Sequence, residues 1–444
     1  MDYDCIIVGA GPAGIFAALE ITSKNRGAKV LILEKGSDLD RRKRREVFCG
    51  WGGAGTFSDG KLNLSKAVGG FLGEYLDPGE FDGLMEYADG LYLKYGATPE
   101  LKGVDAPSVA AIEENAARAG LRLLPFPIRH MGTDRCIGLL SNLREELGAR
   151  VEIRFGSEVS EIITEGGEMA GVRTTDGASF GARFVILCPG RSGSAWLQEV
   201  ARGCGFHIDI NPVDIGVRVE VPASILRSVT DVLHEAKLTY TSRKFDDNIR
   251  TFCMNPYGVV VKELGTDFCT VNGHSYSVRK SENTNFAILV STTFTEPFHE
   301  PIAYGQYIAR LANLLGEGII VQRLGDLMHG RRSTPSRIRR GAVSPTLADA
   351  TPGDLSFVIP YRYICDILEM LDALDRFAPG MNSPSTLLYG VEVKFYSMRL
   401  KLTDALETEL PGLFAAGDGA GVTRGIMHAS VSGIVAAREI LRRL

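Results

Sequence analysis

His428 and Lys61 are the two side chains whose type and place in the chain best suit proton transfer to or from a substrate. An imidazole can titrate near neutral pH, and a well-positioned side chain can act as a general acid or base. His428 stands two residues inside the last predicted helix, where a packed or capping histidine is the alternative. Further candidates for proton transfer are Tyr257, His274, Tyr276, Lys394 and Arg399.

The eight cysteines offer little metal or disulfide chemistry. They are widely spaced, and none forms a C-x-x-C pair or a cluster with the seven histidines. This pattern argues against a redox disulfide, a zinc site and an iron–sulfur centre, so no metal is expected. Most cysteines should be small buried apolar residues. Cys49 could be a nucleophile or a covalent tether, but the sequence gives it no partner histidine or cysteine.

The elements that must position these side chains begin with a βαβ unit. The stretch "DYDCIIVGAGPAGIFAALEI" runs from a buried parallel strand, Cys5 to Val8, through three glycines into a helix, and "KVLILEKG" adds a second strand ending on Glu34. In such a unit Gly9 permits the tight turn, Gly11 lets the backbone approach a pyrophosphate, and Gly14 lets helix and strand pack closely.

This unit predicts a bound dinucleotide. Helix amides after Pro12 and Ala13 would face the phosphates, and Glu34, twenty residues beyond Gly14, would accept hydrogen bonds from ribose hydroxyls, with Lys35 beside it. An NADP enzyme would usually have a cation in place of Glu34. FAD and NAD therefore both remain open on these residues alone.

A second glycine-rich stretch, "CGWGGAGTFSDGKLN", follows from Cys49 to Asn63. Glycines here would allow the backbone to lie directly against a cofactor, where a Cβ would collide. The alternative is a surface loop of turn formers, which Trp51 and Phe57 make a poor fit. The predicted cofactor contacts in this stretch are Gly52, Gly53, Ala54, Gly55, Thr56, Ser58 and Asp59.

Two later segments have the same strand-then-glycine character. "FVILCPGRSGS" is a buried strand running into Pro189 and Gly190, and a small β-meander precedes it with turns at Gly166–Gly167 and Asp176–Gly177. "LPGLFAAGDGAGVTRGIMHASVSGIVAAREIL" gives a strand, the sequence Gly417-Asp418, and a last helix that begins near Ile426.

Four stretches together, "GGAGTFSDGKL", "CMNPYGVVV", "NGHSYSVRKSENTNFAILVS" and "AAGDGAG", resemble a family usually called uncharacterised FAD-dependent dehydrogenases. These are relatives of p-hydroxybenzoate-hydroxylase-like and HI0933-like flavoproteins. The similarity extends from Tyr3 to the C-terminal helix. It implies the glutathione-reductase-like, two-dinucleotide fold, FAD as the cofactor and redox chemistry on an organic substrate. This chain differs from the family at Met427 and His428, where the family often has small residues.

The resemblance also implies roles for single residues. Asp418 would bind the ribitol or phosphate of FAD, the helix after Gly425 and Ile426 would aim its N-terminus at the flavin's pyrimidine edge, and the backbone at Val159 would meet adenine. The second glycine stretch would run along the pyrophosphate and ribitol towards the flavin ring, so that Ser58 to Asn63 could see substrate.

The expected fold class is α/β: a Rossmann-like FAD-binding domain with an inserted mixed α+β substrate or cap domain. The expected boundaries are 1–204 and 389–444 for the FAD-binding domain and 205–388 for the insertion, which contains no second G-x-G-x-x-G unit. Arg41 to Arg45 are expected mainly as a solvated helix start, with contact to a pyrophosphate or a partner as the alternative. The five arginines in "HGRRSTPSRIRRG" would clamp a carboxylate or phosphate if near the pocket, or have no specific role at the surface.

Composition limits the partners. The chain has 444 residues, 45% of them hydrophobic and 23% charged, with a net charge of -5. There is no basic excess that would favour nucleic acid, and no apolar run of the roughly 18 to 20 residues that a membrane span needs. The expected setting is the cytoplasm and the expected partner a small organic substrate, an anion being one option. The oligomeric state is not predicted.

The leading functional hypothesis is an FAD-dependent dehydrogenase or reductase that moves a hydride between flavin N5 and a substrate carbon, with NAD(P)H open as a transient co-substrate. The alternative is a flavin monooxygenase using NAD(P)H and O₂, although the chain lacks the "D-G-x-x-S-x-x-R" motif of related hydroxylases. A third reading is an FAD-binding scaffold or sensor without turnover.

Overall fold

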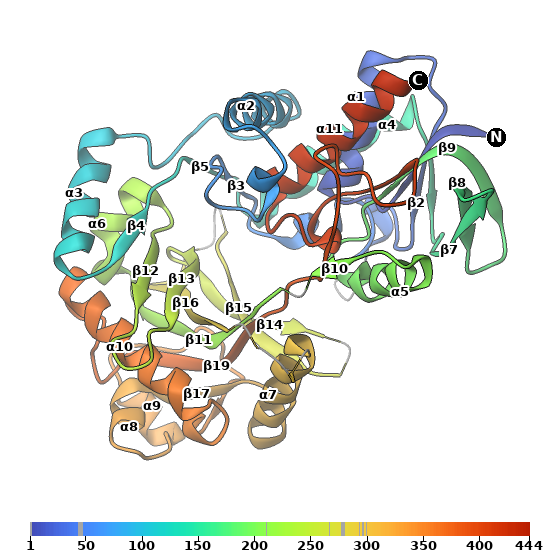
Figure 1. The fold of residues 1–444 in the computed structure, drawn as a ribbon. Coiled ribbons are helices and arrows are strands. Elements are labelled where there is room, and N and C mark those ends of the chain that lie inside the picture. Colours follow the sequence, from blue (N-terminus) through green and yellow to red (C-terminus); the bar gives the residue numbers. More distant parts are fainter. Residues whose placement is uncertain are drawn as a thin grey trace. The chain divides into compact units, whose positions relative to one another are not determined.

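The computed structural model describes residues 2–42, 48–209, 211–265, 267–276, 280–292, 294, 297–298 and 300–444, and only the backbone of Phe57, Thr133 and Asp134. Two compact units divide the chain (Figure 1). The first contains residues 1–100, 129–211 and 396–444, and the second contains 101–128 and 212–395.

The first unit is built on a parallel sheet in the order β6-β2-β1-β9-β21. The strands are β1 (Tyr3–Val8), β2 (Val30–Glu34), β6 (Glu152–Phe155), β9 (Ser179–Leu187) and β21 (Leu413–Ala415). Cys5 and Ile7 join the apolar core on one face, and Ile6 and Val8 join the core on the other. Because both faces of the sheet are buried at β1, the sequence of this strand contains a continuous apolar run.

Helices cover both faces of this sheet. On one face lie α1 (Pro12–Lys24), α2 (Pro78–Lys94), α4 (Thr133–Gly148) and α11 (Ile426–Arg443), and on the other lies α5 (Ser194–Cys204). Figure 1 shows α1 and α11 side by side, at opposite ends of the colour scale. The two helices can approach closely because Gly433 of α11 has no side chain. A Cβ at that position would overlap the carbonyl oxygen of Ala13.

The antiparallel meander predicted beside the parallel sheet is present. It consists of β7 (Val159–Glu165), β8 (Glu168–Thr174) and the first half of β9. Shorter elements complete this unit. They are η1 (Leu39–Arg41), η2 (Gly53–Phe57), η3 (Leu72–Glu74), η4 (Arg191–Gly193), η6 (Asp418–Ala420), β3 (Lys61–Asn63) with β5 (Ile128–His130), and β10 (Ile208–Asp209) with β20 (Arg399–Leu400).

The second unit contains an eight-stranded sheet in the order β18-β17-β19-β11-β16-β13-β12-β4, antiparallel except for the pair β17 and β18. Its strands are β4 (Arg122–Leu124), β11 (Val213–Pro222), β12 (Lys237–Thr241), β13 (Asn248–Asn255), β16 (Asn283–Thr292), β17 (Ile320–Arg323), β18 (Thr351–Pro352) and β19 (Leu387–Lys394). A hairpin of β14 (Val259–Leu264) and β15 (Cys269–His274) accompanies it.

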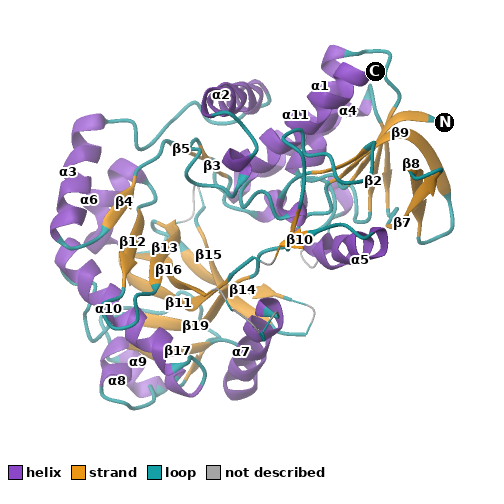
Figure 2. Cartoon of the chain, viewed as in Figure 1, coloured by secondary structure: helices purple, strands orange, loops and turns teal. Residues whose placement is uncertain are grey.

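The apolar face of this sheet packs against helices, which Figure 2 shows in purple beside the orange strands. These helices are α3 (Ala106–Arg118), α6 (Ala223–Leu233), α7 (Pro301–Gly316) and α10 (Tyr361–Phe377); α8 (Leu324–Met328), α9 (Pro335–Arg339) and η5 (Leu355–Phe357) complete the unit. Residues 101–128 group with this unit because Ala116, Leu121 and Leu123 enter its core and β4 pairs with β12.

The other face of β11 is polar and yet buried. Arg218 is fully buried and forms two hydrogen bonds of 2.7 Å with the carboxylate of Glu392. Lys394 continues the network, with its Nζ 3.2 Å from Glu392 and 3.2 Å from Glu263. These paired charges satisfy each other, as buried ions must. Within the described residues, no helix is long and apolar enough to cross a bilayer.

Candidate functional site

The first glycine motif adopts the geometry that its spacing predicts. Gly9 has φ +105°, and a Cβ there would overlap the carbonyl oxygen of Cys188. A Cβ on Gly14 would overlap the carbonyl oxygen of Gly9, so helix and strand pack closely. Around Gly11, by contrast, a Cβ would meet no protein atom within 4 Å. Gly11 thus faces open space at the N-terminus of α1, where a ligand can approach the backbone.

Glu34 is a hub for the loops around this motif. Its Oε2 accepts a hydrogen bond from the Ala10 amide at 2.8 Å, and its Oε1 accepts from the amides of Gly36 at 2.8 Å and Gly50 at 2.7 Å. The side chain is buried. A carboxylate can accept about four hydrogen bonds, so Oε2 keeps capacity for a further donor such as a hydroxyl. The structural task of Glu34 was not predicted from the sequence.

The second glycine stretch lies directly on the first. The Gly52 amide donates to the carbonyl oxygen of Ala10 at 2.8 Å, and a Cβ on Gly53 would lie 3.2 Å from Gly11 Cα. Gly55 has Pro12 as its neighbour on α1. Ala54 and Thr56 belong to the same short helix, η2, and Ser58 Oγ donates to the Gly55 carbonyl oxygen at 2.9 Å.

Arg42 holds this stretch in place, a role that sequence reasoning missed. Its guanidinium donates to the carbonyl oxygens of Trp51 at 2.6 Å and Gly53 at 2.9 Å, and to Thr56 Oγ1. The signal was present in the basic run from Arg41, but only the structure gives the bonding partners. The rest of that run, residues 43–45, lies outside the described residues.

The C-terminal glycine loop meets the loop after β9. A Cβ on Gly419 would lie 2.7 Å from the carbonyl oxygen of Gly190 and 2.8 Å from Pro189 Cγ. Gly417 donates its amide to Ser432 Oγ of α11 at 3.0 Å. Asp418 accepts a hydrogen bond from Thr423 Oγ1 at 2.6 Å. Burial raises the pKa of the Asp418 carboxyl above its ordinary value, and the positive charge of Arg191 partly offsets this rise.

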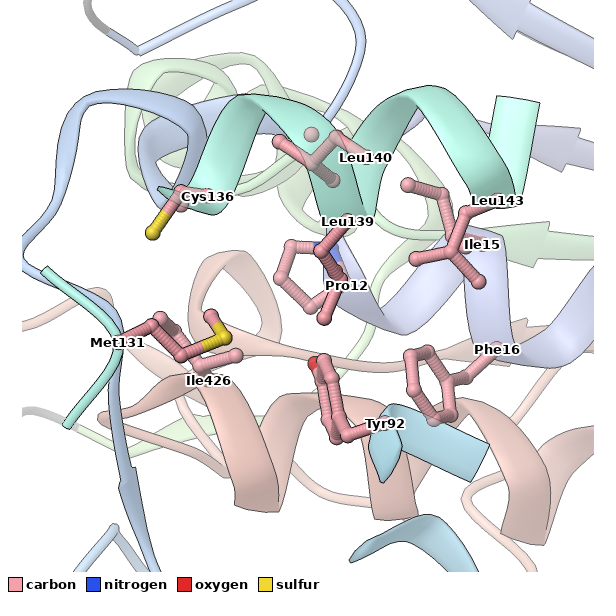
Figure 3. A pocket seen from close by; sticks show the side chains of 12 residues that line it. Pro12, Ile15, Phe16, Tyr92, Met131, Cys136, Leu139, Leu140, Leu143 and Ile426 are labelled. Atoms are coloured by element: carbon pink, nitrogen blue, oxygen red, sulfur yellow. The ribbon is translucent and has the colours of Figure 1, made fainter. Parts of the chain in front are cut away.

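An apolar cavity of about 30 Å³ lies inside the first unit where several of these segments meet (Figure 3). Pro12, Ile15 and Phe16 of α1 line it, with Leu139 and Leu140 of α4. Its lining also includes Gly52, Gly55, Tyr92, Met131, Cys136, Leu143 and Ile426. Figure 3 shows Ile426, the first residue of α11, facing Pro12 across this space together with Met131. Three predicted cofactor loops therefore border one cavity.

Asp59 and Lys61 form an ion pair just after the second glycine stretch. Lys61 Nζ lies 3.0 Å from Asp59 Oδ2, and the side chains are only 8% and 11% exposed. Lys61 begins β3, and backbone hydrogen bonds join Asp59 and Gly60 to Gly132 and Met131. The pair therefore stands on an ordered, mostly buried segment.

His428 is packed in the core of the first unit. It is 1% exposed, its ring meets Phe81 edge-on at 5.0 Å between centroids, and its Nε2 donates to the carbonyl oxygen of Ser65 at 2.8 Å. This hydrogen bond is one of several that fasten residues 65–71 to residues 422–428. The Phe71 amide bonds to Val422, and the Arg424 amide bonds to Gly69.

The remaining predicted contacts lie at the outer end of the same sheet. Ser157 donates its amide to the Glu34 carbonyl oxygen at 3.0 Å, which sets Val159, at the start of β7, beside the end of β2. Lys35 Nζ lies 3.5 Å from the Ser192 carbonyl oxygen and 3.8 Å from Glu158.

The other candidates for proton transfer lie in different parts of the chain. Arg399 forms an ion pair with Glu74 at 2.6 Å. Tyr257, His274, Tyr276 and Lys394 belong to the second unit.

The residues present fit a dinucleotide such as FAD. The helices α1 and α11 have Gly11 and Gly425 as their N-cap residues, and neither has a capping side chain or an acidic residue in its first turn. Their first amides and their dipoles therefore favour anionic groups. The open space at Gly11 and the glycine-lined backbone at Gly52 to Gly55 suit close contact with a pyrophosphate and its neighbours.

Comparisons with known proteins point in the same direction. Residues 212–395 match a family described as "FAD-dependent protein, C-terminal domain-like". An uncharacterized protein of Clostridium beijerinckii is 29% identical over 477 residues, which cover 99% of this chain and 80% of that protein. The family match supports FAD as the cofactor and an FAD-dependent enzyme as the class of protein.

Solved structures similar to the chain include a glycine oxidase and an L-proline dehydrogenase. Glycine oxidase from Geobacillus kaustophilus is 15% identical, with 99% of this chain and 95% of that chain covered and a TM-score of 0.40. L-proline dehydrogenase from P. horikoshii is 13% identical, with coverage of 100% and 94% and a TM-score of 0.42.

Proposed function

We propose that the protein is an FAD-dependent oxidoreductase that transfers a hydride between flavin N5 and a carbon of a small organic substrate. The observation that carries this proposal is the meeting of three glycine loops, from Gly9, Gly52 and Gly417, around the uncapped start of α1. The family match of residues 212–395 supports the cofactor. We also propose that the chain is related to p-hydroxybenzoate-hydroxylase-like flavoproteins.

Within this proposal the cofactor loops bind FAD along its length. Gly9, Gly11, Pro12, Ala13 and Gly14 would hold the pyrophosphate at α1, and Glu34, Lys35 and Val159 would hold the adenosine end. The loops at Pro189 to Gly190 and at Gly417 to Asp418 would contact the middle of the cofactor, and Gly425 and Ile426, at the start of α11, would contact the flavin. When bound, FAD supplies N5 as the atom that accepts or donates the hydride.

We assign proton transfer to Lys61, because Asp59 fixes its ammonium group at 3.0 Å on the segment that follows the glycine stretch. His428 enters as a positioning residue, since its ring holds residues 65–71 against the start of α11. The second unit is the proposed substrate domain. The sequence placed this domain at residues 205–388, whereas the contacts within the structure group residues 101–128 and 212–395.

The deciding experiment is an anaerobic titration of the FAD-loaded protein with NADH, NADPH and a panel of small organic acids, amines and alcohols, followed by flavin absorbance. The expected result is bleaching of the oxidised flavin by at least one compound. Protein that is colourless after FAD has been added and the unbound FAD removed would refute FAD as the cofactor. NAD(P)H oxidation coupled to a hydroxylated product and O₂ uptake would instead establish a monooxygenase.

Lys61→Met tests the proton-transfer role. The variant should keep FAD but slow the half-reaction that changes the flavin's redox state by about 100-fold, the low end of what a general acid or base contributes. Lys66→Met is the matched control, because Lys66 is a partly exposed lysine paired with Asp82 at 2.7 Å on the same segment of the chain. Equal rates for both variants and the wild type would remove Lys61 from the chemistry.

A further inference from the structure

An arginine-rich segment of the second unit has no part in the proposed redox chemistry. Between Arg323 and Gly341 the sequence holds six arginines and one acidic residue, Asp326. The segment forms α8 and α9, which Figure 1 shows next to β17. It contributes +5 to a chain with a net charge of -5, so the remaining residues carry -10. Positive charge is thus concentrated in a mostly acidic molecule.

The single acid of the segment is committed to internal contacts. Asp326 is fully buried and accepts hydrogen bonds from Arg331 Nε at 2.9 Å and from Ser333 Oγ at 2.8 Å. Arg337 Nε lies 3.9 Å from the same carboxylate. Burial alone would raise the pKa of Asp326, but Ser333, Arg331 and the other nearby arginines bring it below its ordinary value. Asp326 therefore stays charged and orders the segment from within.

Hydrogen bonds to the backbone give the segment a defined shape. Arg337 Nη1 donates to the Arg332 carbonyl oxygen at 2.8 Å, and Arg323 Nη1 donates to the Arg337 carbonyl oxygen at 3.1 Å. Thr334 Oγ1 caps α9 by accepting from the Arg337 amide. The exposed side chains consequently project from a fixed frame, which lowers the entropic cost of binding a partner.

Three arginines on this frame are available to bind a partner. Arg332, Arg339 and Arg340 are exposed, and within the described part of the chain no carboxylate lies within ion-pair distance of any of them. A guanidinium is planar, permanently charged and weakly hydrated, so it can pair bidentately with carboxylates of a partner.

Large apolar side chains are exposed on the same part of the unit. Met328, at the end of α8, is 57% exposed, and Phe357, at the end of η5, is 74% exposed. The two segments are joined by Gln322, whose Nε2 donates to the Arg331 carbonyl oxygen at 2.9 Å while its Oε1 accepts from the Leu355 amide at 2.8 Å. Arginine, methionine and aromatic residues are the types enriched in protein–protein interfaces.

We propose that Arg332, Arg339, Arg340, Met328 and Phe357 form a docking surface for an acidic protein. Charge complementarity selects an acidic partner, and the two exposed apolar side chains select a protein surface that also offers apolar contacts.

The test uses two fluorescent probes, poly-L-glutamate and a random copolymer of glutamate and tyrosine, with binding followed by anisotropy of the full chain. The triple variant R332Q/R339Q/R340Q should bind both probes about tenfold more weakly than the wild type. The matched control is R118Q/R150Q/R442Q, which changes the net charge equally at three arginines already paired with nearby glutamates. Equal losses in the two triple variants would overturn the proposal.

Phe357→Ser separates the apolar contribution from the charge. It should weaken binding of the copolymer about threefold and leave poly-L-glutamate binding unchanged, because only the copolymer offers aromatic rings. If the triple variant does not fold, the single variants R332Q and R340Q should each give a partial loss. Tighter binding of single-stranded RNA than of either acidic polymer would assign the surface to nucleic acid and overturn the acidic-protein partner.

Discussion

At the scale of single residues, the glycines of the first motif have separable tasks. Gly9 and Gly14 are required by the protein's own packing, since a Cβ on either would overlap a backbone carbonyl oxygen. Gly11 is different, because the space that its Cβ would enter contains no protein atom within 4 Å. The open space at Gly11, at the N-terminus of α1, leaves room for a ligand to lie against the backbone.

We therefore expect Gly11→Ala to leave the free energy of unfolding of the FAD-free protein within about 0.5 kcal/mol of the wild-type value. The same variant should bind FAD at least about tenfold more weakly, because the methyl group enters the space proposed for the pyrophosphate. Urea unfolding gives the first quantity and fluorescence titration with FAD the second. Unchanged FAD affinity would place the pyrophosphate elsewhere.

The sequence predicted the tight turn at Gly9 and the close packing at Gly14, because these depend on local spacing, whereas the approach of a pyrophosphate to Gly11 stays a prediction. The sequence could not predict the bonds of Glu34 to Gly50 or of Arg42 to Gly53, because they join residues through a turn whose path is set by tertiary packing. The same limit applies to His428. Its position near the start of a helix was evident, but its burial against Phe81 depends on α2, which no local pattern places there.

At the scale of elements, the pairing of α1 with α11 is the contact that completes the first unit. It rests on Gly433, since a Cβ there would overlap the carbonyl oxygen of Ala13, which no rotamer change could relieve. The helices approach closely through small residues, and Ala17, Ala436 and Ala437 are buried in the same core. Their packing positions both helix N-termini of the candidate site.

Gly433→Ala should lower the free energy of unfolding by on the order of 1 to 3 kcal/mol, the usual range for overpacking a close contact. Gly138→Ala in α4 is the matched control, since nothing lies within 4 Å of a Cβ at that position. It should stabilise the protein by up to about 1 kcal/mol through helix propensity. Chemical denaturation of both variants tests this contrast, and a neutral Gly433→Ala would mean that the two helices can separate without cost.

The strands β1, β2, β9 and β21 of the parallel sheet and the turns of the meander could be predicted because they carry continuous apolar runs or regular turn residues. The strand β6 was instead expected in the meander, because its sequence EIRF has no such run. The assignment of residues 101–128 to the second unit could not be predicted. It depends on β4 pairing with β12, a partner more than a hundred residues away, and on the apolar side of α3, which has one fully buried residue, Ala116.

At the scale of the whole molecule, stability should depend on pH through two neighbouring carboxyl groups, one of which is buried. Asp366 of α10 is fully buried, and its neighbour Asp247 is held by Arg362 through hydrogen bonds of 2.5 and 2.6 Å. Burial raises the pKa of Asp366 to about 6, with Asp247 adding to the rise and Ser242 opposing it. The pKa of Asp247 is lowered, chiefly by its hydrogen bond to Arg362.

A carboxyl with a raised pKa binds its proton more tightly in the folded state than in the unfolded state. Stability contributed by protonated Asp366 is therefore present below about pH 4 and is lost as the pH rises towards 6. Asp366→Asn should remove this loss and stabilise the protein above pH 7 by on the order of 2 kcal/mol. Urea midpoints at pH 5 and pH 8 measure it, with the exposed Asp231→Asn as control. Parallel pH profiles for Asp366→Asn and the wild type would contradict the assignment.

The first unit draws its residues from three stretches, and its last helix, α11, follows the whole second unit in the chain. During synthesis α1 and the first glycine motif are made early, but Gly433 reaches Ala13 only after residues 212–395 have been made. Domains tend to fold as they emerge, and an incomplete one exposes apolar surface. The second unit should thus fold before the first on the ribosome, and the α11-facing side of the βαβ segment should stay uncovered until α11 has been made.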